Sequence, residues 1–326
     1  MRELRISPQA ITDNVRALTR QAGTDQAMVV VKANGYGHGA ELAARAALEG
    51  GATWLGTADI DESLALRQAG IQAPLLAWLI GPDSAVSEAI EQSVDLGVSS
   101  IGQLEQIVAA ASSAQPALVH IKIDSGMGRG GVLPADWPEL FDRAASAQRE
   151  GTIAVRGIFT HMSLRDPESD LAQARLFEQA IDDLASRGIH PELRHAASST
   201  AAARSSELRF DMVRLGIASY GIAQTEEHQA LGLRPAMRFR GQVIVVKRLP
   251  AGHGVGYDLT YTTPKETTMA LVPLGYADGV PRHGSSVGPV SLDGQRFTLS
   301  GRVSMDQITI DVGDTPVEVG QWVTLW

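Results

Sequence analysis

The residue in this chain that most directly suggests catalytic chemistry is a lysine at the end of an apolar run. Lys32 lies in the segment VVVKANGYGHG (Val29–Gly39), and the glycine-rich loop that follows it contains Tyr36. A lysine amine in a desolvated pocket can condense with the aldehyde of a cofactor. Strand-end lysines are more commonly solvated surface groups, so the spacing alone leaves both interpretations open.

The apolar run before Lys32 is one of eight that predict buried strands. They are Ala27–Ala33, Thr53–Ala58, Pro74–Ile80, Val94–Ser100, Ala117–Asp124, Val155–Met162, Glu192–Ser199 and Asp211–Gly221. Segments of helical periodicity, such as Ala40–Glu49, Asp61–Ala69 and Glu168–Ser186, separate many of them. This alternation favours a TIM (β/α)8 barrel, whose catalytic groups lie where the strands end. A doubly wound sheet is the alternative, but no G-x-G-x-x-G follows the first strand.

The pattern changes after about Gly232. Short strand-like runs then follow one another between Gly and Pro turns, at Arg240–Arg248, Thr268–Leu274, Val287–Leu292 and Gln307–Val312. We therefore expect a barrel over residues 1–233 and a C-terminal, mostly β domain over residues 234–326.

Several further segments, together with the one around Lys32, resemble the motifs of the alanine racemases and occur in the same order. They are IKIDSGMGRGG (Ile121–Gly131), FTHMS (Phe159–Ser163), HAASS (His195–Ser199), VRLGIASYG (Val213–Gly221), GVGYDLTY (Gly254–Tyr261), LGYADG (Leu274–Gly279) and GRVSMDQ (Gly301–Gln307). One such motif is a weak signal, whereas the ordered set is specific. The family's fold, a TIM barrel followed by a β domain, agrees with the layout expected above.

The resemblance implies a pyridoxal 5'-phosphate enzyme that interconverts L- and D-alanine and supplies D-alanine for peptidoglycan. Lys32 would carry the cofactor and act as the base on one face of the substrate. Tyr257 would be the base on the other face, supplied by the second subunit of a homodimer with shared active sites. His161 would lie beside this tyrosine with Arg214 next in line, since a nearby positive charge favours phenolate.

The same resemblance assigns the remaining cofactor contacts. Arg214 would face the pyridine nitrogen as a hydrogen-bond donor that does not readily release a proton. The phosphate would be held by Tyr36, Ser199, Gly216 and Ile217. Barrels often bind phosphate after strands 7 and 8, and Ser199 is expected to end the seventh strand, with Gly216 and Ile217 in the eighth.

Three residues would serve the amino-acid substrate. Its carboxylate would meet Arg129 and the backbone N–H of Met305, the latter from the partner subunit, and Tyr276 would narrow the entrance. In some family members the lysine at the position of Lys122 is carbamylated and holds the active-site arginine. A solvated strand lysine is the alternative for Lys122.

Three positions depart from the family pattern. Ser198 stands where the family usually has Asn, and Ser304 where many members have Cys. The chain stops at Trp326, before a segment whose tyrosine contacts the phosphate in the family, so we expect the β domain to be truncated. Two other functions stay open for this reason: a racemase of broader range, for example on serine, and a catalytically impaired cofactor-binding protein.

Composition excludes several function classes. The chain has 326 residues, a net charge of −9 and no cysteine. The negative charge argues against nucleic-acid binding, and the lack of cysteine rules out disulfides and thiolate metal sites. None of the eight histidines forms H-E-x-x-H, so we expect no catalytic metal. The start lacks a signal-peptide pattern and no apolar run could span a membrane, which favours a cytoplasmic protein.

Overall fold

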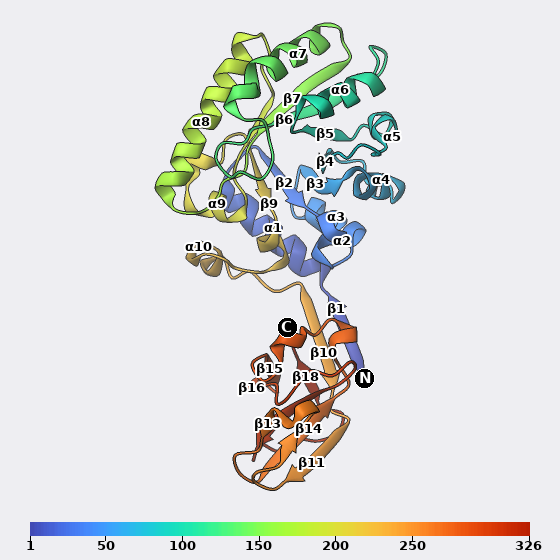
Figure 1. Cartoon of the computed structure of the whole chain (residues 1–326), viewed down its shortest axis with the longest axis vertical. Coiled ribbons are helices and arrows are strands. Elements are labelled where there is room, and N and C mark those ends of the chain that lie inside the picture. Colours follow the sequence, from blue (N-terminus) through green and yellow to red (C-terminus); the bar gives the residue numbers. More distant parts are fainter. The chain divides into compact units, whose positions relative to one another are not determined.

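The computed structural model describes all residues from Met1 to Trp326 and divides into two compact units. One unit comprises Ser7–Ala236, and the other combines Met237–Trp326 with the first six residues of the chain. This division differs from the expected boundary at residues 233/234, chiefly because Met1–Ile6 join the C-terminal unit. The colours of Figure 1 show this grouping, since the dark blue N-terminal strand lies beside an orange one.

The larger unit is built on eight parallel strands, in the order β8-β7-β6-β5-β4-β3-β2-β9. They are β2 (Gln26–Val30), β3 (Trp54–Asp59), β4 (Leu75–Leu79), β5 (Asp95–Val98), β6 (Ala117–Lys122), β7 (Ile153–Phe159), β8 (Leu193–His195) and β9 (Met212–Leu215). The two outer members, β8 and β9, close the ring through a bridge between Ser198 and Arg214. The predicted TIM barrel followed by a mostly β domain is therefore confirmed.

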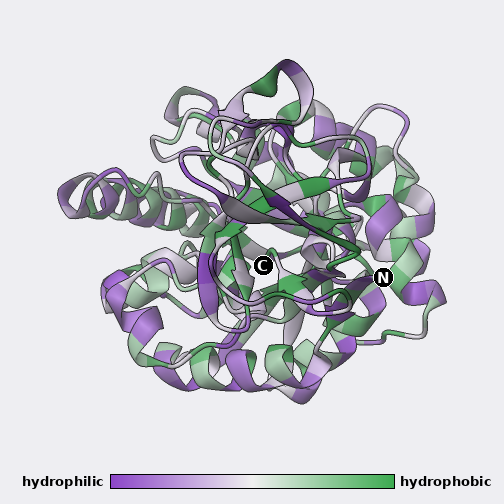
Figure 2. Ribbon diagram, turned by 90° about the horizontal axis from the view of Figure 1, so that it is seen from below, coloured by the Kyte–Doolittle hydropathy of each residue, from purple (hydrophilic) through white to green (hydrophobic).

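Ten helices accompany these strands. They are α1 (Pro8–Ala22), α2 (Lys32–Tyr36), α3 (Ala40–Glu49), α4 (Ile60–Gln68), α5 (Val86–Glu91), α6 (Ile101–Ala110), α7 (Trp137–Arg149), α8 (Pro167–Ser186), α9 (Ser199–Arg204) and α10 (Glu226–Ala230). The side chains of Ser7, Asp59 and Asp166 cap α1, α4 and α8 by accepting hydrogen bonds from first-turn N–H groups. In Figure 2 these helices are green on part of their circumference and purple on the rest, as expected for helices that cover a barrel. No helix has both the length and the apolar character needed to cross a membrane.

The barrel interior is part apolar and part polar. Met28, Trp54, Leu76 and Met212 form a small apolar cluster there. Buried polar side chains from β5, β6, β8 and β9 share this space, namely Asp95, His120, His195 and Arg214. Buried polar groups are costly unless they are hydrogen-bonded, so their pairing is a constraint on the fold.

The C-terminal unit contains three antiparallel sheets. The largest has the order β1-β10-β18-β15-β16, and the others are β11-β14-β17 and β12-β13. Their bounds are β1 (Arg2–Ile6), β10 (Met237–Gln242), β11 (Val245–Leu249), β12 (Gly254–Val255), β13 (Tyr261–Thr262), β14 (Thr267–Val272), β15 (Pro289–Leu292), β16 (Gln295–Thr298), β17 (Ile308–Gly313) and β18 (Trp322–Thr324). The expected single strand Arg240–Arg248 is wrong, because the chain leaves one sheet after Gln242 and enters another at Val245.

Candidate active site

Lys32 begins a single helical turn directly beyond β2. The turn contains Ala33, Asn34, Gly35 and Tyr36 at positive φ, an arrangement that costs energy for the three non-glycine residues. A carboxylate supports it, since the Ala33 N–H donates to Glu62 Oε1 at 2.7 Å. The Lys32 ammonium lies 5.6 Å from the centre of the Trp78 ring. Burial, and then the charge of Arg129, lower the pKa of Lys32 against the opposing effect of Glu62.

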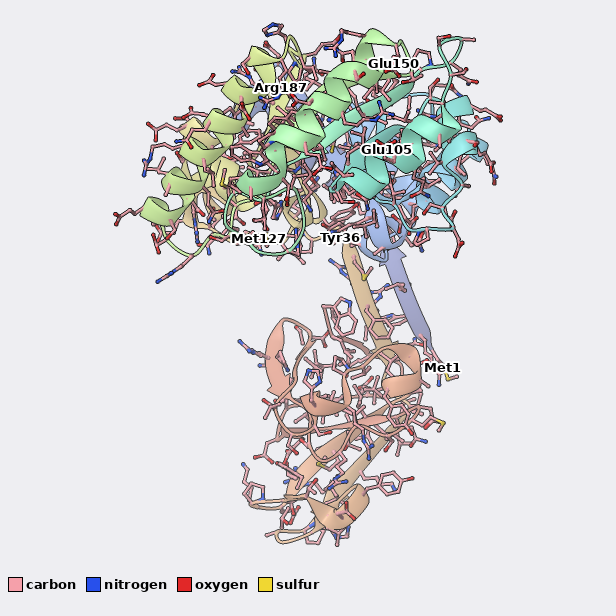
Figure 3. The ribbon with its side chains drawn as sticks, turned by 45° about the horizontal axis from the view of Figure 1, so that its top comes forward. Met1, Tyr36, Glu105, Met127, Glu150 and Arg187 are labelled. Atoms are coloured by element: carbon pink, nitrogen blue, oxygen red, sulfur yellow. The ribbon has the colours of Figure 1, made fainter.

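Topology brings the other barrel residues to the same end of the unit. Figure 3 shows Tyr36 and Met127, which follow β2 and β6, at one end of the barrel unit, and Glu150 and Arg187, which precede β7 and β8, at the other. The strands are parallel, so segments that follow them meet at one face.

Tyr36, Ser199 and Gly216 converge at this face. Ser199 Oγ accepts a hydrogen bond from the Gly216 N–H at 2.8 Å. A Cβ placed on Gly216 would lie 2.9 Å from the Tyr36 hydroxyl, so glycine is needed for this close approach. The expected strand positions are wrong: β8 ends at His195 and β9 at Leu215, so Ser199 opens α9 and Ile217 opens the 3-10 turn η3 (Ile217–Tyr220). Both nevertheless present helix-start geometry, in which N–H groups are free for an anion.

Arg214 is buried in the barrel, and both of its terminal nitrogens donate hydrogen bonds to protein acceptors. One terminal nitrogen, Nη1, donates to the carbonyl and to Nδ1 of His195 at 2.9 and 3.0 Å. The other, Nη2, donates to the carbonyls of Thr160 and Ala196, both at 2.7 Å, and contacts His161 Nδ1 at 3.1 Å. Burial, and then Arg129, lower the pKa of Arg214 to about 9, so it remains charged near neutral pH.

The imidazole of His161 is the acceptor in its contact with Arg214, because a guanidinium has no lone pair to offer. Burial, and next the charge of Arg214, lower the pKa of His161 to about 3. The positive charge at this point of the site therefore belongs to Arg214, and His161 is a neutral group beside it.

Lys122 and Arg129 lie on β6 and on the loop that follows it. The loop turns back over the strand end, because Val132 donates to the Lys122 carbonyl at 2.9 Å and a Cβ on Gly130 would lie 3.4 Å from Lys122 Nζ. Burial, followed by the charges of Arg129 and Arg214, lowers the pKa of Lys122. Lys32, Lys122, Arg129 and Arg214 thus form a group of interacting cations at the barrel mouth.

The remaining predicted residues belong to the C-terminal unit. Tyr276 and Met305 lie on loops joined by backbone hydrogen bonds, from Tyr276 to the Ser304 carbonyl at 3.0 Å and from Ala277 to the Met305 carbonyl at 2.9 Å. A side chain on Gly275 would collide with this second loop. The side chains of Tyr257, Tyr276 and Met305 are all exposed within the chain, and Tyr257 is 69% exposed.

Sequence reasoning overlooked Glu62 and the polar residues inside the barrel. Asp95 and His120 lie within largely apolar runs, at the start of β5 and inside β6, and both are buried, so their polar side chains were a signal for a buried polar network. Glu62 carried no such signal, because an acidic residue in a first helical turn is common for reasons of helix stability alone.

Comparisons with known proteins agree with this geometry. The sequence models of the alanine racemase N-terminal and C-terminal domains match residues 6–224 and 236–326. The chain is 46% identical to an alanine racemase of Salinispora tropica over 329 residues, which cover 99% of this chain and 88% of that protein. An alanine racemase of Thermobifida fusca is 45% identical over 328 residues, with coverage of 99% and 88%.

A solved structure supports the same relationship. The crystal structure of alanine racemase from Streptomyces lavendulae superposes with a TM-score of 0.94 at 42% identity, covering 99% of this chain and 87% of that one. The chain therefore belongs to the alanine racemase family, whose members are isomerases.

Proposed function

We propose that this protein interconverts L- and D-alanine at the barrel mouth with pyridoxal 5'-phosphate carried by Lys32, and so supplies D-alanine for cell-wall peptidoglycan. The observation that carries the proposal is the convergence of Lys32 with the group formed by Tyr36, Ser199 and Gly216. A reactive amine and an anion site at one end of a barrel are what an aldehyde cofactor with a phosphate needs.

The residues present fit that cofactor. Tyr36, Ser199, Gly216 and Ile217 would hold the phosphate through two hydroxyls and the N–H groups at the start of η3, with the Gly216 N–H exchanging its hydrogen bond to Ser199 Oγ for one to the phosphate. Burial raises the pKa of Tyr36, which keeps its hydroxyl protonated as a donor. Arg214 would face the pyridine nitrogen through Nε, its only nitrogen without a protein partner.

When bound, the cofactor supplies an electron sink that makes the Cα proton of an amino acid acidic. The lowered pKa of Lys32 favours the neutral amine, which is the form that acts as a nucleophile and as a proton acceptor. We propose that Lys32 moves the proton on one face of Cα and Tyr257 on the other. Two bases suit racemisation, since a single base tends to return the proton to the face it left.

The exposure of Tyr257 within its own chain supports its donation to a second subunit. We propose a homodimer in which the Tyr257 hydroxyl meets the Nε2–H of a neutral His161, whose other nitrogen is held by Arg214. The Arg214 charge behind His161 would then stabilise the tyrosine in its phenolate form.

Arg129 and the backbone N–H of the partner subunit's Met305 would bind the substrate carboxylate, and Tyr276 would restrict the entrance to small side chains. Lys122 is further proposed as a carbamylation site. Its lowered pKa favours the neutral amine that combines with carbon dioxide, releasing one proton and leaving an anionic carbamate. That anion would pair with Arg129, whose charge already acts on Lys122.

The test is to incubate the protein, cofactor and L-alanine in D₂O, and to follow Cα deuterium by NMR and D-alanine by a chiral assay. We expect both signals, and we expect Lys32→Ala to abolish both. Cofactor binding without exchange would instead indicate a cofactor carrier. Comparing rates on alanine, serine and lysine in the same assay identifies a broader racemase.

A further inference from the structure

A line of hydrogen-bonded side chains crosses the barrel interior behind Arg214. His195 Nδ1 lies 3.0 Å from Arg214 Nη1, and His195 Nε2 lies 2.9 Å from His120 Nδ1. His120 Nε2 then lies 3.2 Å from Asp95 Oδ2, and Asp95 Oδ1 accepts from Arg156 Nη1 at 3.1 Å. Both histidines are fully buried and Asp95 is 1% exposed, so water does not substitute for the links among these three residues.

The barrel is shaped around these imidazoles. The His195 ring stacks on Phe159 with 4.9 Å between centres and 4° between planes, and the His120 ring packs edge-on against Trp54. A Cβ on Gly157 would occupy the position of the His120 ring, so β7 must carry a glycine there. Such fitted surroundings hold each ring nitrogen toward its partner.

The hydrogen-bond direction follows from the two ends of the line. Arg214 can only donate, so His195 Nδ1 accepts and His195 carries its proton on Nε2. Burial, followed by the charge of Arg214, keeps the pKa of His195 well below its usual range, so this ring is neutral. Its Nε2–H donates to His120 Nδ1, and the His120 Nε2–H then donates to the Asp95 carboxylate.

We infer that Asp95, held by Arg156, acts through His120 and His195 as a positioning residue for Arg214. The carboxylate fixes the tautomer of both histidines. His195 therefore presents a lone pair to Arg214 Nη1, and the Nε–H of Arg214 stays directed at the cofactor ring. The inference rests on the proposed function in one respect, namely that Arg214 faces the pyridine nitrogen.

The substitution Asp95→Asn tests the direction of these hydrogen bonds. Its amide has one acceptor oxygen and one NH₂ group, whereas both neighbours of Asp95, His120 Nε2 and Arg156 Nη1, are donors. When the oxygen stays with the charged Arg156, the NH₂ group faces His120 and makes Nε2 an acceptor. Both histidines then change tautomer, and an N–H of His195 opposes the N–H of Arg214.

A second substitution, Arg156→Met, removes this clash between the N–H groups of His195 and Arg214. In Asp95→Asn with Arg156→Met, the amide is free to turn its oxygen toward the His120 Nε2–H and restore both tautomers. Arg156 is partly exposed and its guanidinium packs 4.8 Å from the Trp54 ring, a position that the methionine chain can fill. Rescue of one variant by loss of a second residue is not expected from a merely structural role.

The experiment labels histidine with ¹⁵N in the full chain without cofactor and reads the ring tautomers by NMR. We expect Nε2–H for His120 and His195 in the parent chain, Nδ1–H in Asp95→Asn, and Nε2–H again in the double variant. After cofactor loading, Asp95→Asn should shift the absorption band of the bound cofactor and lower kcat about 10- to 100-fold, and the double variant should recover both.

An Nδ1–H tautomer of His195 in the parent chain overturns the inference, and this result does not depend on any variant folding. Tautomers that change as expected without a shift of the cofactor band overturn the positioning role. Neither result touches the proposed function, which fails separately if Lys32→Ala loads cofactor and racemises as the parent chain does.

Discussion

At the scale of single residues, the site gathers positive charge in an acidic protein. The chain has a net charge of −9, yet Lys32, Lys122, Arg129 and Arg214 influence one another at the barrel mouth. Burial, and then the repulsion from neighbouring cations, lower the pKa of the two lysines, and anionic ligands relieve that repulsion. A phosphate and a substrate carboxylate suit this charge, and both were expected from the sequence.

Removal of the Tyr36 hydroxyl should weaken cofactor binding. A hydrogen bond to a charged group contributes about 1.5–3 kcal/mol, so Tyr36→Phe is expected to bind the cofactor about 10- to 150-fold less tightly in a spectroscopic titration. Tyr220→Phe is the matched control, since its hydroxyl donates to the Val30 carbonyl at 2.9 Å within the core. It should lower the free energy of unfolding by about 0.5–1.5 kcal/mol and leave affinity unchanged. Equal affinities in the two variants would contradict the role of Tyr36.

The rate of cofactor uptake should depend on pH through Lys32. Only the neutral amine reacts, and the pKa of Lys32 is lowered from 10.5, so the rate should rise to a plateau below that pH. Arg129→Met removes a charge that lowers this pKa, and the profile should move to higher pH. Arg149→Met, which alters a residue at the other end of the barrel before β7, should leave the profile in place. The measurement is absorbance after mixing with cofactor, and coincident profiles for parent and Arg129→Met would argue against the coupling.

At the scale of elements, α4 supports the turn that carries Lys32. Its capping residue is Asp59, and Glu62 in its first turn accepts from the N–H groups of Ala33 and Ala58 at 2.7 and 2.8 Å. The left-handed residues after Lys32 are thus held by a neighbouring helix start. Periodicity could predict α4 but not this support, because the contact joins residues far apart in sequence.

Loss of the α4 cap should destabilise the barrel modestly. Asp59 Oδ1 accepts from the Glu62 N–H at 2.9 Å, and replacing such a cap by alanine costs about 1 kcal/mol. We expect that decrease for Asp59→Ala in urea unfolding, and a smaller one for Asp59→Ser, which can still cap. If the two variants are equally stable, the cap contributes little here.

Helices and strands with a strong hydrophobic periodicity were predictable from the sequence, whereas strands that form only by pairing with a distant part of the chain were not. The helix Ala40–Glu49 forms with its predicted bounds, and the runs of Val and Leu form the barrel strands. The short strand Arg2–Ile6 was missed, because two of its five residues are charged arginines and its pairing partner lies near residue 240. The barrel layout predicted Lys32 at a strand end and a phosphate site near the last strands, and only the family resemblance implied the roles of Arg129, His161 and Arg214. The Asp95 line needed the three-dimensional pairing.

At the scale of the whole molecule, the C-terminal unit exposes the large hydrophobic side chains of Tyr257, Leu259 and Met305. Exposed side chains of this kind are more typical of an interface than of a surface in contact with water. The proposed homodimer would bury these side chains against a second copy. The test is complementation between two inactive chains, Lys32→Ala and Tyr257→Phe, coexpressed with different tags.

A mixed dimer would contain one site with both substitutions and one intact site. With random pairing half of the dimers are mixed, so activity should recover to about one quarter of the parent value. Purified mixed dimers should show about half. An absence of recovery in mixed dimers would mean that Tyr257 serves the site of its own chain.

The pairing of β1 with β10 also sets an order of events during synthesis. Arg2 lies opposite Gly241 and Ile6 opposite Met237. The first residues translated therefore pair with a strand that is translated more than two hundred residues later. The barrel, Ser7–Ala236, is complete before that partner emerges. A fragment that begins at Met237 would carry β10 as an unpaired edge, a surface open to aggregation. The unit that is synthesised last therefore needs the first residues of the chain to complete its five-stranded sheet.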